Sequence, residues 1–232
     1  MTDQAHIPTH IGFILDGNRR WAKAQGLPKL EGHRRGYDNL KSIAEACLDR
    51  GIKVVSAYIF STENWQREES EVSYLMDLAL KIFTRDLQEF DDKGFRIIIS
   101  GVREKLSDKL LQAIDESMER TRNNTKGILN LCFNYGGQLE ITEAVKKIVA
   151  AGTAADQITT DTIRDNLFAP ELPPVDFIVR TSGEQRLSNF LLWDSAYAEL
   201  CFVSTPWPAF SAAELDEVLA DYQTRQRRFG GS

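Results

Sequence analysis

The sequence has no apolar run that approaches the roughly 18 residues a helix needs to cross a bilayer. Its first ten residues, MTDQAHIPTH, lack the basic and then apolar pattern of a secretory signal peptide. We therefore expect a cytoplasmic location, from which the protein could still touch a membrane surface.

Cysteine is scarce, and no two of the three cysteines form a CxxC pair. Cys47, Cys132 and Cys201 are widely spaced and have no neighbouring histidine. This spacing argues against a disulfide framework and against a cysteine metal site. We expect reduced thiols in the core of a protein from a reducing compartment.

An excess of positive charge is also absent, because 28 lysines and arginines stand against 34 aspartates and glutamates. The net charge of −6 argues against nucleic-acid binding through broad phosphate neutralisation. The familiar glycine-rich phosphate loops, GxxxxGKS/T and GxGxxG, are missing as well. With no sign of a purine pocket, an unrelated nucleotide-binding protein is disfavoured.

The chain of 232 residues is long enough for one substantial core, and we expect a single domain over 1–232. Short apolar or β-branched runs predict strands at 11–15, 54–60, 95–100, 128–134, 175–180 and 198–203. Helical patterns begin at Arg19 and Ser107 and cover 33–50, 70–92, 140–151, 162–167 and 212–227. This alternation predicts an α/β fold with a mostly parallel six-stranded sheet flanked by helices.

Three of the predicted strands end in polar clusters. The stretch 10–36 opens with a strand that stops at Asp16, Gly17 and Asn18 and is followed by two arginines. Alone, this reads as a common turn before a solvated helix face. Similar clusters follow the second and fifth strands, at 61–67 and 181–189. Because ligands of parallel sheets bind beyond the carboxyl ends of the strands, we expect the three clusters to form one site.

The charged residues expected at this edge suit phosphorylated ligands. They are Arg19, Arg20, Lys29, His33, Arg34, Arg67, Arg180 and Arg186, with the carboxylates of Asp16, Glu63, Glu184 and Glu199. Guanidinium and backbone N–H groups bind phosphate oxygens, and an aspartate can hold a divalent cation. The helix predicted over 70–92 is apolar over much of its circumference, which fits either a tightly packed core or an apolar ligand. Together these features suggest chemistry on lipid diphosphates that carry magnesium.

The same residues carry a resemblance that covers almost the whole chain. Its motifs are HIGFILDGNRRWA from residue 10, FSTENW at 60–65, NYGG at 134–137, RTSGEQRLSNFLLW at 180–193, AYAEL at 196–200 and the terminal RRFGG. Together they resemble the cis-prenyltransferases, in particular bacterial undecaprenyl diphosphate synthases. The fold that this implies is a single α/β domain with an apolar tunnel.

The resemblance implies a role for each matching residue. Asp16 and Asn64 would be catalytic, and Asp16 and Glu199 would hold Mg²⁺. The residues that would bind the two substrates are Gly17, Asn18, Arg19, Arg20, Trp21, Lys29, His33, Ser61, Thr62, Glu63, Trp65, Arg67, Arg180, Arg186 and Ser188. Within this set, Arg180, Arg186 and Ser188 match the site for isopentenyl diphosphate.

Three positions depart from the family pattern. Arg19 stands where bacterial members often have glycine, and Lys29 stands where an arginine is frequent. The lysine at position 29 replaces a guanidinium group, which can bind a phosphate through two N–H groups at once, by an ammonium group that acts as a point charge. Gln185 stands where some members carry a metal-binding histidine, and a neutral amide is a poor substitute.

The activity implied by the resemblance is condensation of isopentenyl diphosphate with an allylic diphosphate such as farnesyl diphosphate, forming cis double bonds. The product would be a polyprenyl diphosphate such as undecaprenyl diphosphate, used for the cell-wall lipid carrier. A shorter product remains open, because Phe133 is bulky for a tunnel floor. A silent regulatory subunit of the same fold is the alternative from another class, although such subunits tend to lose Asp16 or the cluster after Arg180.

The candidates for the wall and floor of the tunnel are Phe60, Leu78, Ile82, Phe83, Leu129 and Phe133, each of which could equally be plain core. The terminal 227–231 resembles a family tail that reaches across a dimer interface, so we expect a homodimer. Peripheral membrane contact is expected where the lipid product leaves.

Overall fold

The computed structural model describes residues 7–225 and is organised by one sheet of six parallel strands. The strands are β1 (His10–Ile14), β2 (Val54–Ser61), β3 (Phe95–Ser100), β4 (Gly127–Tyr135), β5 (Phe177–Arg180) and β6 (Glu199–Phe202). Their order in the sheet is β3-β4-β2-β1-β5-β6. All six predicted strands are therefore confirmed, and the order places β1 and β2 at the centre.

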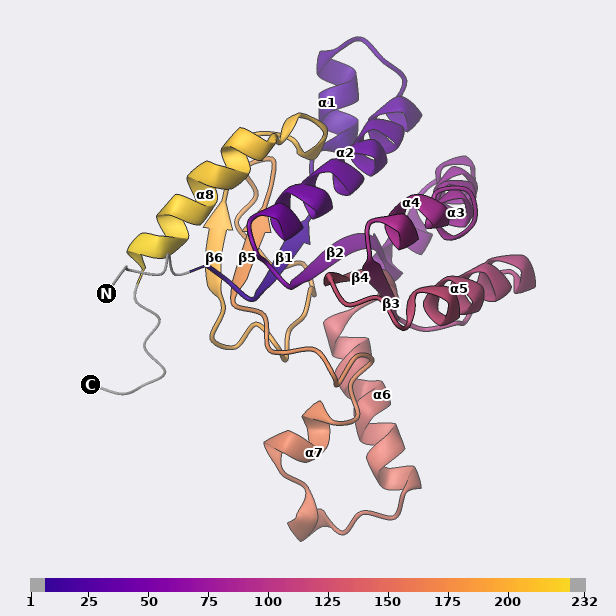
Figure 1. The fold of residues 1–232 in the computed structure, drawn as a ribbon. Helices are drawn as coiled ribbons and strands as arrows, with labels where there is room; N and C mark the ends of the chain where they lie inside the picture. The colour runs from indigo at the N-terminus through magenta and orange to yellow at the C-terminus, as the bar shows by residue number, and fades with distance from the viewer. Residues whose placement is uncertain (1–6, 226–232) are drawn as a thin grey trace.

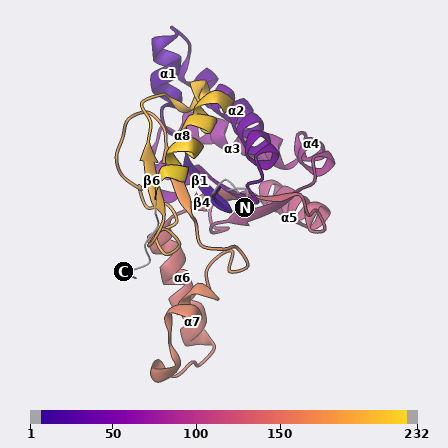
Figure 2. The ribbon, with the colours of Figure 1, turned by 60° about the vertical axis from the view of Figure 1, so that its left-hand side comes forward.

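Helices cover the sheet and extend beyond it (Figure 1). They are α1 (Asn18–Ala24), α2 (Lys29–Asp49), α3 (Glu69–Phe83), α4 (Leu87–Asp92), α5 (Asp108–Thr121), α6 (Gly137–Ala150), α7 (Thr160–Arg164) and α8 (Ala212–Thr224). The helices α2 and α8 pack side by side, whereas α6 and α7 project together away from the sheet in both views (Figures 1 and 2).

The alternation of side chains along β1 explains the two layers. Ile11 and Phe13 face the main core, which α2, α3 and α8 complete. Ile14 belongs to a smaller cluster on the other face with Phe190 and Tyr135. Successive residues of a strand point to opposite faces, so an apolar strand must be covered on both sides.

The helix predicted over 70–92 is wrong as a single element, because the chain breaks between α3 and α4. Thr84 leaves the helical conformation, and its hydroxyl donates to the Leu80 carbonyl at 2.7 Å. Two residues later, Asp86 accepts the hydroxyl of Tyr37 from α2 at 2.5 Å. This long-range bond holds the bend, after which Leu87 and Phe90 bury their side chains in α4.

The other helix boundaries shift by a few residues. Helix α2 begins at Lys29 after Pro28, four residues before the predicted start, and α6 begins at Gly137. Helix α8 ends at Thr224, so the predicted end at Arg227 and the terminal RRFGG motif lie outside the described residues.

The cysteines behave largely as expected. Cys47 and Cys132 are buried and Cys201 is half-buried, and none of the three is in a disulfide. Among residues 7–225, no helix is long and apolar enough to cross a membrane.

Candidate active site

Asp16 lies just beyond the carboxyl end of β1, where the chain turns sharply into α1. The turn depends on Gly17, whose φ of 102° places it in the left-handed region. A Cβ added there would lie 2.6 Å from the Ser182 hydroxyl, so the close approach of the two loops also requires glycine. The Gly17 N–H donates to Oδ1 of Asp16 at 2.7 Å, which fixes the carboxylate at the start of the helix.

Two arginines hold the other oxygen of Asp16. Arg180, at the end of β5, donates to Oδ2 at 2.9 Å, and Nη2 of Arg20 lies 3.2 Å from the same atom. Burial alone would raise the pKa of Asp16, but these guanidinium groups bring the pKa below its ordinary value. The carboxylate is therefore ionised at neutral pH.

Arg180 is buried, yet its charge is well placed for a ligand. Its Nη1 donates to the Ser188 hydroxyl at 2.7 Å and to the Arg186 carbonyl at 2.5 Å. Its buried Nε has no hydrogen-bond partner among the described residues. Buried donors are normally satisfied, so this unpaired N–H leaves the Arg180 guanidinium incompletely bonded where it lines a cavity beside Asp16. Arg186 and Glu184 form an exposed ion pair at 2.5 Å next to this group.

The segment after β2 supplies the polar residues that face Asp16. The pairing of β2 with β4 is irregular between Tyr58 and Ser61, and this irregularity changes the direction of β2 at its carboxyl end. A 3₁₀ helix (Thr62–Gln66) follows, and its first turn is closed by Asn64, whose Oδ1 accepts from the Ser61 N–H at 3.1 Å. Trp65 donates its indole N–H to Asn134 at 2.8 Å, which anchors the segment to β4.

A second charged group surrounds Glu71, a residue that the sequence analysis missed. Its Oε1 lies 2.8 Å from Nη1 of Arg67 and 3.2 Å from Nε2 of His33. Its Oε2 lies 3.5 Å from Nζ of Lys29 and 3.6 Å from Nη1 of Arg19. The four-residue spacing of Arg67 and Glu71 is a weak local signal, because Arg67 precedes α3 and the other three partners of Glu71 are distant in sequence.

Burial and charge set the ionisation in this second group. Burial raises the pKa of Glu71, but Arg67 and His33 lower it to below its ordinary value. Burial lowers the pKa of His33 and Arg67 lowers it further, which outweighs the opposing effect of Glu71. Glu71 is therefore an anion, and His33 is neutral at neutral pH.

Two adjoining cavities connect these groups. A polar cavity of about 550 Å³ is lined by Ile14, Leu15, Asp16, Tyr58, Ser61, Glu63, Asn64, Arg67, Arg180, Arg186, Ser188 and Asn189. A narrower cavity of about 130 Å³ shares four of these, Leu15, Tyr58, Asn64 and Arg67, and continues between α2, α3 and the sheet. The predicted convergence of the clusters after β1, β2 and β5 is thus confirmed.

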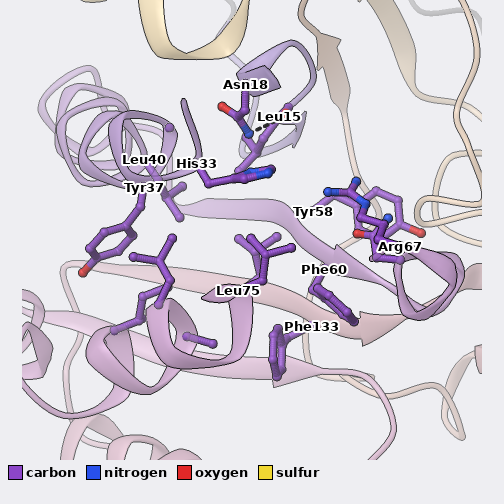
Figure 3. A pocket seen from close by; sticks show the side chains of 16 residues that line it. Leu15, Asn18, His33, Tyr37, Leu40, Tyr58, Phe60, Arg67, Leu75 and Phe133 are labelled. Atoms are coloured by element: carbon purple, nitrogen blue, oxygen red, sulfur yellow. Dashed lines mark hydrogen bonds between the residues drawn. The ribbon is translucent and has the colours of Figure 1, made fainter. Parts of the chain in front are cut away.

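The narrower cavity is polar on one side and apolar on the other. Asn18, His33 and Arg67 lie along one side, and Phe133 lies along the opposite side (Figure 3). Four of the six tunnel candidates line this cavity, namely Phe60, Leu78, Ile82 and Phe133. The other two, Phe83 and Leu129, are buried core residues outside the lining. The Phe133 ring is packed by Phe60 and Phe83, with ring centres 5.6 and 6.2 Å away.

Some predicted residues lie away from these cavities. Trp21, Thr62 and Trp65 belong to the flanking helices without lining either cavity, and Arg34 pairs with Glu31 and Asp38 on α2. Gln185 is exposed and does not line either cavity.

Glu199 is the main residue that the fold does not bring to this site. It begins β6 and is in register with Phe177, the first residue of β5, so it lies toward the amino end of the sheet. Its carboxylate pairs with Arg225 at 3.1 Å. Within the chain, Asp16 and Glu199 are therefore separated by the length of the strands and do not form a common metal site.

The donors present fit a magnesium ion that arrives with its phosphate ligand. In the described range, no three His, Cys, Asp or Glu side chains are grouped to hold a metal. Magnesium usually binds one or two carboxylates together with substrate phosphates. Asp16 supplies one ionised carboxylate at the polar cavity, which matches that arrangement.

The fold and site define an α/β protein in which cationic side chains gather beside an apolar cavity. A sequence model of the family described as "Putative undecaprenyl diphosphate synthase" matches residues 14–230. An isoprenyl transferase of Neisseria meningitidis serogroup B is 42% identical over 224 residues, covering 97% of this chain and 90% of the relative. An isoprenyl transferase of Thermotoga maritima is 43% identical over 227 residues, covering 97% of each protein.

Solved structures give the same result. Lavandulyl diphosphate synthase from Lavandula x intermedia, in complex with dimethylallyl diphosphate, superposes with a TM-score of 0.93 at 33% identity, covering 97% of this chain and 99% of that one. A probable undecaprenyl diphosphate synthase from Campylobacter jejuni superposes with a TM-score of 0.83 at 27% identity, covering 97% and 100%. The chain belongs to the undecaprenyl diphosphate synthase family and is a cis-prenyltransferase.

Proposed function

We propose that this enzyme condenses isopentenyl diphosphate with an allylic prenyl diphosphate, with farnesyl diphosphate as the starter, and forms a cis double bond at each step. The observation that carries the proposal is the joining of two cationic groups, one at Asp16 and Arg180 and one at His33 and Arg67, by a shared cavity lining. Two anion sites beside an apolar cavity suit two diphosphates, one of which carries a growing lipid.

The two cationic groups have different tasks in this proposal. Arg180, Arg186 and Ser188 bind isopentenyl diphosphate, because they form one hydrogen-bonded group around an unpaired guanidinium N–H. His33 and Arg67 bind the allylic diphosphate, because they line the cavity that leads toward Phe133. The resemblance adds Gly17, Asn18, Arg20 and Lys29, on or next to α1 and α2, to the contacts of the allylic diphosphate. It places Ser61 near the reacting carbons, and it gives as further substrate-binding residues Arg19, Trp21, Thr62, Glu63 and Trp65.

The residues stabilise charge as the reaction proceeds. The allylic C–O bond breaks and leaves its electrons on the departing diphosphate, where His33 and Arg67 meet the developing charge. The double bond of isopentenyl diphosphate forms the new C–C bond, and a proton then passes to an oxygen of the released diphosphate. Asn64, held by the Ser61 N–H, lies in both cavities and orients the reacting carbons. Mg²⁺ bound by Asp16 and the phosphates would neutralise part of their charge.

Undecaprenyl diphosphate for the cell-wall lipid carrier is the product that the family description supports. A shorter product is the second candidate, favoured by the size of the apolar cavity. A cavity of about 130 Å³ is similar to one that holds a single benzene, and so to one five-carbon unit. A long chain therefore requires the rings around Phe133 to move apart.

Product analysis tests both candidates. Purified protein is incubated with Mg²⁺, labelled isopentenyl diphosphate and geranyl or farnesyl diphosphate, and the products are separated by chain length. Incorporation that depends on both substrates supports the proposal, and the length distribution chooses between the candidates. Absence of incorporation with every allylic starter would favour a silent regulatory subunit instead.

The remaining proposals concern assembly and location. We propose a homodimer of single-domain chains in the cytoplasm, with peripheral membrane contact during product release and no nucleic-acid partner. The resemblance of the terminal 227–231 to a family tail supports the dimer, and the position of Glu199 far from Asp16 leaves its predicted metal role without support within one chain. Analytical ultracentrifugation tests the dimer, and sedimentation with lipid vesicles tests the membrane contact.

A further inference from the structure

Glu71 is a buried carboxylate at the first turn of α3, and the proposed function gives it no task. Its side chain is 1% exposed, although four cationic or basic groups surround it. These groups come from separate parts of the chain, with Arg19 on α1, Lys29 and His33 on α2, and Arg67 just before α3. A single carboxylate therefore links the three segments that border the apolar cavity.

The two oxygens of Glu71 have different contacts. Oε1 accepts from Arg67 at 2.8 Å and contacts His33 at 3.2 Å, and the side chain of His33 is only 6% exposed. Oε2 is 3.5 Å from Lys29 and 3.6 Å from Arg19, whose side chains are exposed, so these two contacts are weak. Oε1 thus holds the two groups that line the cavity, and Oε2 makes looser contacts with groups outside it.

This geometry also assigns the proton on His33. An ionised carboxylate only accepts hydrogen bonds, so the Nε2 atom that faces Glu71 must carry the hydrogen. Nδ1 is then the nitrogen that can take up a proton. The charged groups facing the imidazole are Glu71, Arg67 and Arg19, and of these only Glu71 favours its protonated form.

We propose that Glu71 is a positioning residue for the allylic diphosphate, because it orients His33 and Arg67 and keeps the cationic groups together before the substrate binds. The proposal rests on the proposed function for the identity of that substrate. Without the carboxylate, the cations repel one another and the imidazole loses its fixed tautomer. The empty site would then be disordered, and binding of the diphosphate would have to order it.

The test compares Glu71→Gln with Glu68→Gln. Glutamine keeps the size of the side chain and removes its charge, and Glu68 is a matched control because it contacts Lys29 from the exposed surface. We expect the KM for the allylic diphosphate to rise about tenfold or more in Glu71→Gln, with the KM for isopentenyl diphosphate unchanged. Glu68→Gln should change neither value by more than about twofold. A lower allylic KM in Glu71→Gln would show that Glu71 competes with the substrate, and an unchanged KM would show that it does not position the site. Either result would overturn the proposal.

A second measurement does not depend on turnover or on the variant folding. The chain has three histidines, so ¹⁵N NMR can resolve His33 in the wild-type protein. We expect neutral His33 to carry its proton on Nε2 and inorganic diphosphate to perturb its signals; a proton on Nδ1 would contradict the assignment. Where Glu71→Gln folds, its His33 pKa should be lower than in the wild type. If the wild type shows this tautomer and yet incorporates no isopentenyl diphosphate, the proposed function fails while the contact stands.

Discussion

Single side chains at the carboxyl edge of the sheet decide the charge of the site. Asp16 stays ionised because Arg180 and Arg20 offset the cost of its burial. Arg180 is buried and, among residues 7–225, pairs with the carboxylate of Asp16 alone, so each of the two charges depends on the other. This dependence separates Asp16 from an ordinary turn aspartate.

We predict that Asp16→Asn lowers the rate of isopentenyl diphosphate incorporation by about 100-fold or more while the fold is kept. Asparagine keeps the size and the hydrogen-bond acceptor, but it loses the charge that faces Arg180 and the oxygen proposed to hold Mg²⁺. Steady-state kinetics measures the rate, and circular dichroism checks the fold. Asp165→Asn, an exposed change directly after α7, should leave both unchanged, and near wild-type rates in Asp16→Asn would contradict the assignment.

At the scale of elements, the sequence was sufficient for the strands and insufficient for the contacts between helices. Each strand is a short apolar run, which is a local signal. The break at Thr84 depends on the bond between Tyr37 and Asp86, which are 49 positions apart, and no local pattern records it. Glu71 was missed for the same reason, because its partners on α1 and α2 are distant in sequence.

The expected position of Glu199 at the carboxyl edge of the sheet is wrong for a different reason. The predicted strand 198–203 already placed Glu199 near the start of a strand, whereas the other candidates follow the ends of strands. In a parallel sheet these positions lie at opposite edges, and the register of Glu199 with Phe177 shows it.

The start of α6 contains a carboxylate that makes stability depend on pH. Burial raises the pKa of Glu140 to about 7, although the Tyr135 hydroxyl and the Phe168 N–H donate to it. The folded protein therefore binds a proton that the unfolded chain releases near its ordinary pKa of 4.5. The stabilisation is complete below that pH and is lost as the pH rises toward 7.

We predict that Glu140→Gln removes the loss of stability that occurs as the pH rises toward 7. Between pH 4.5 and 8, the free energy of unfolding of the wild type should fall by about 3 kcal/mol more than that of the variant. Urea denaturation at several pH values measures the difference. Glu119→Gln, at an exposed position on α5, is the control and should follow the wild type. Parallel curves for Glu140→Gln and the wild type would show that Glu140 is ionised throughout.

The packing of α3 against β4 limits the apolar cavity at Phe133. We predict that Phe133→Leu lengthens the product by at least one isoprene unit, because a smaller side chain opens the end of the cavity. Phe90→Leu is a matched control, since Phe90 is equally buried but packs on Phe95 outside the cavity. Chromatography of the products measures the length. The same distribution in Phe133→Leu and wild type would show that another residue ends the chain.

At the scale of the whole molecule, an apolar cavity between helices implies that product release is slow. Each added isoprene brings five more carbons out of water, which is worth about 4 kcal/mol if all are buried. The lipid is therefore held more tightly at each step, while the diphosphate sites are emptied and refilled. We predict an initial burst of product followed by a slower steady state, and we expect detergent or vesicles to speed only the second phase. Rapid-quench kinetics separates the phases. A linear time course from the first turnover would mean that bond formation limits the rate and that the cavity releases its lipid freely.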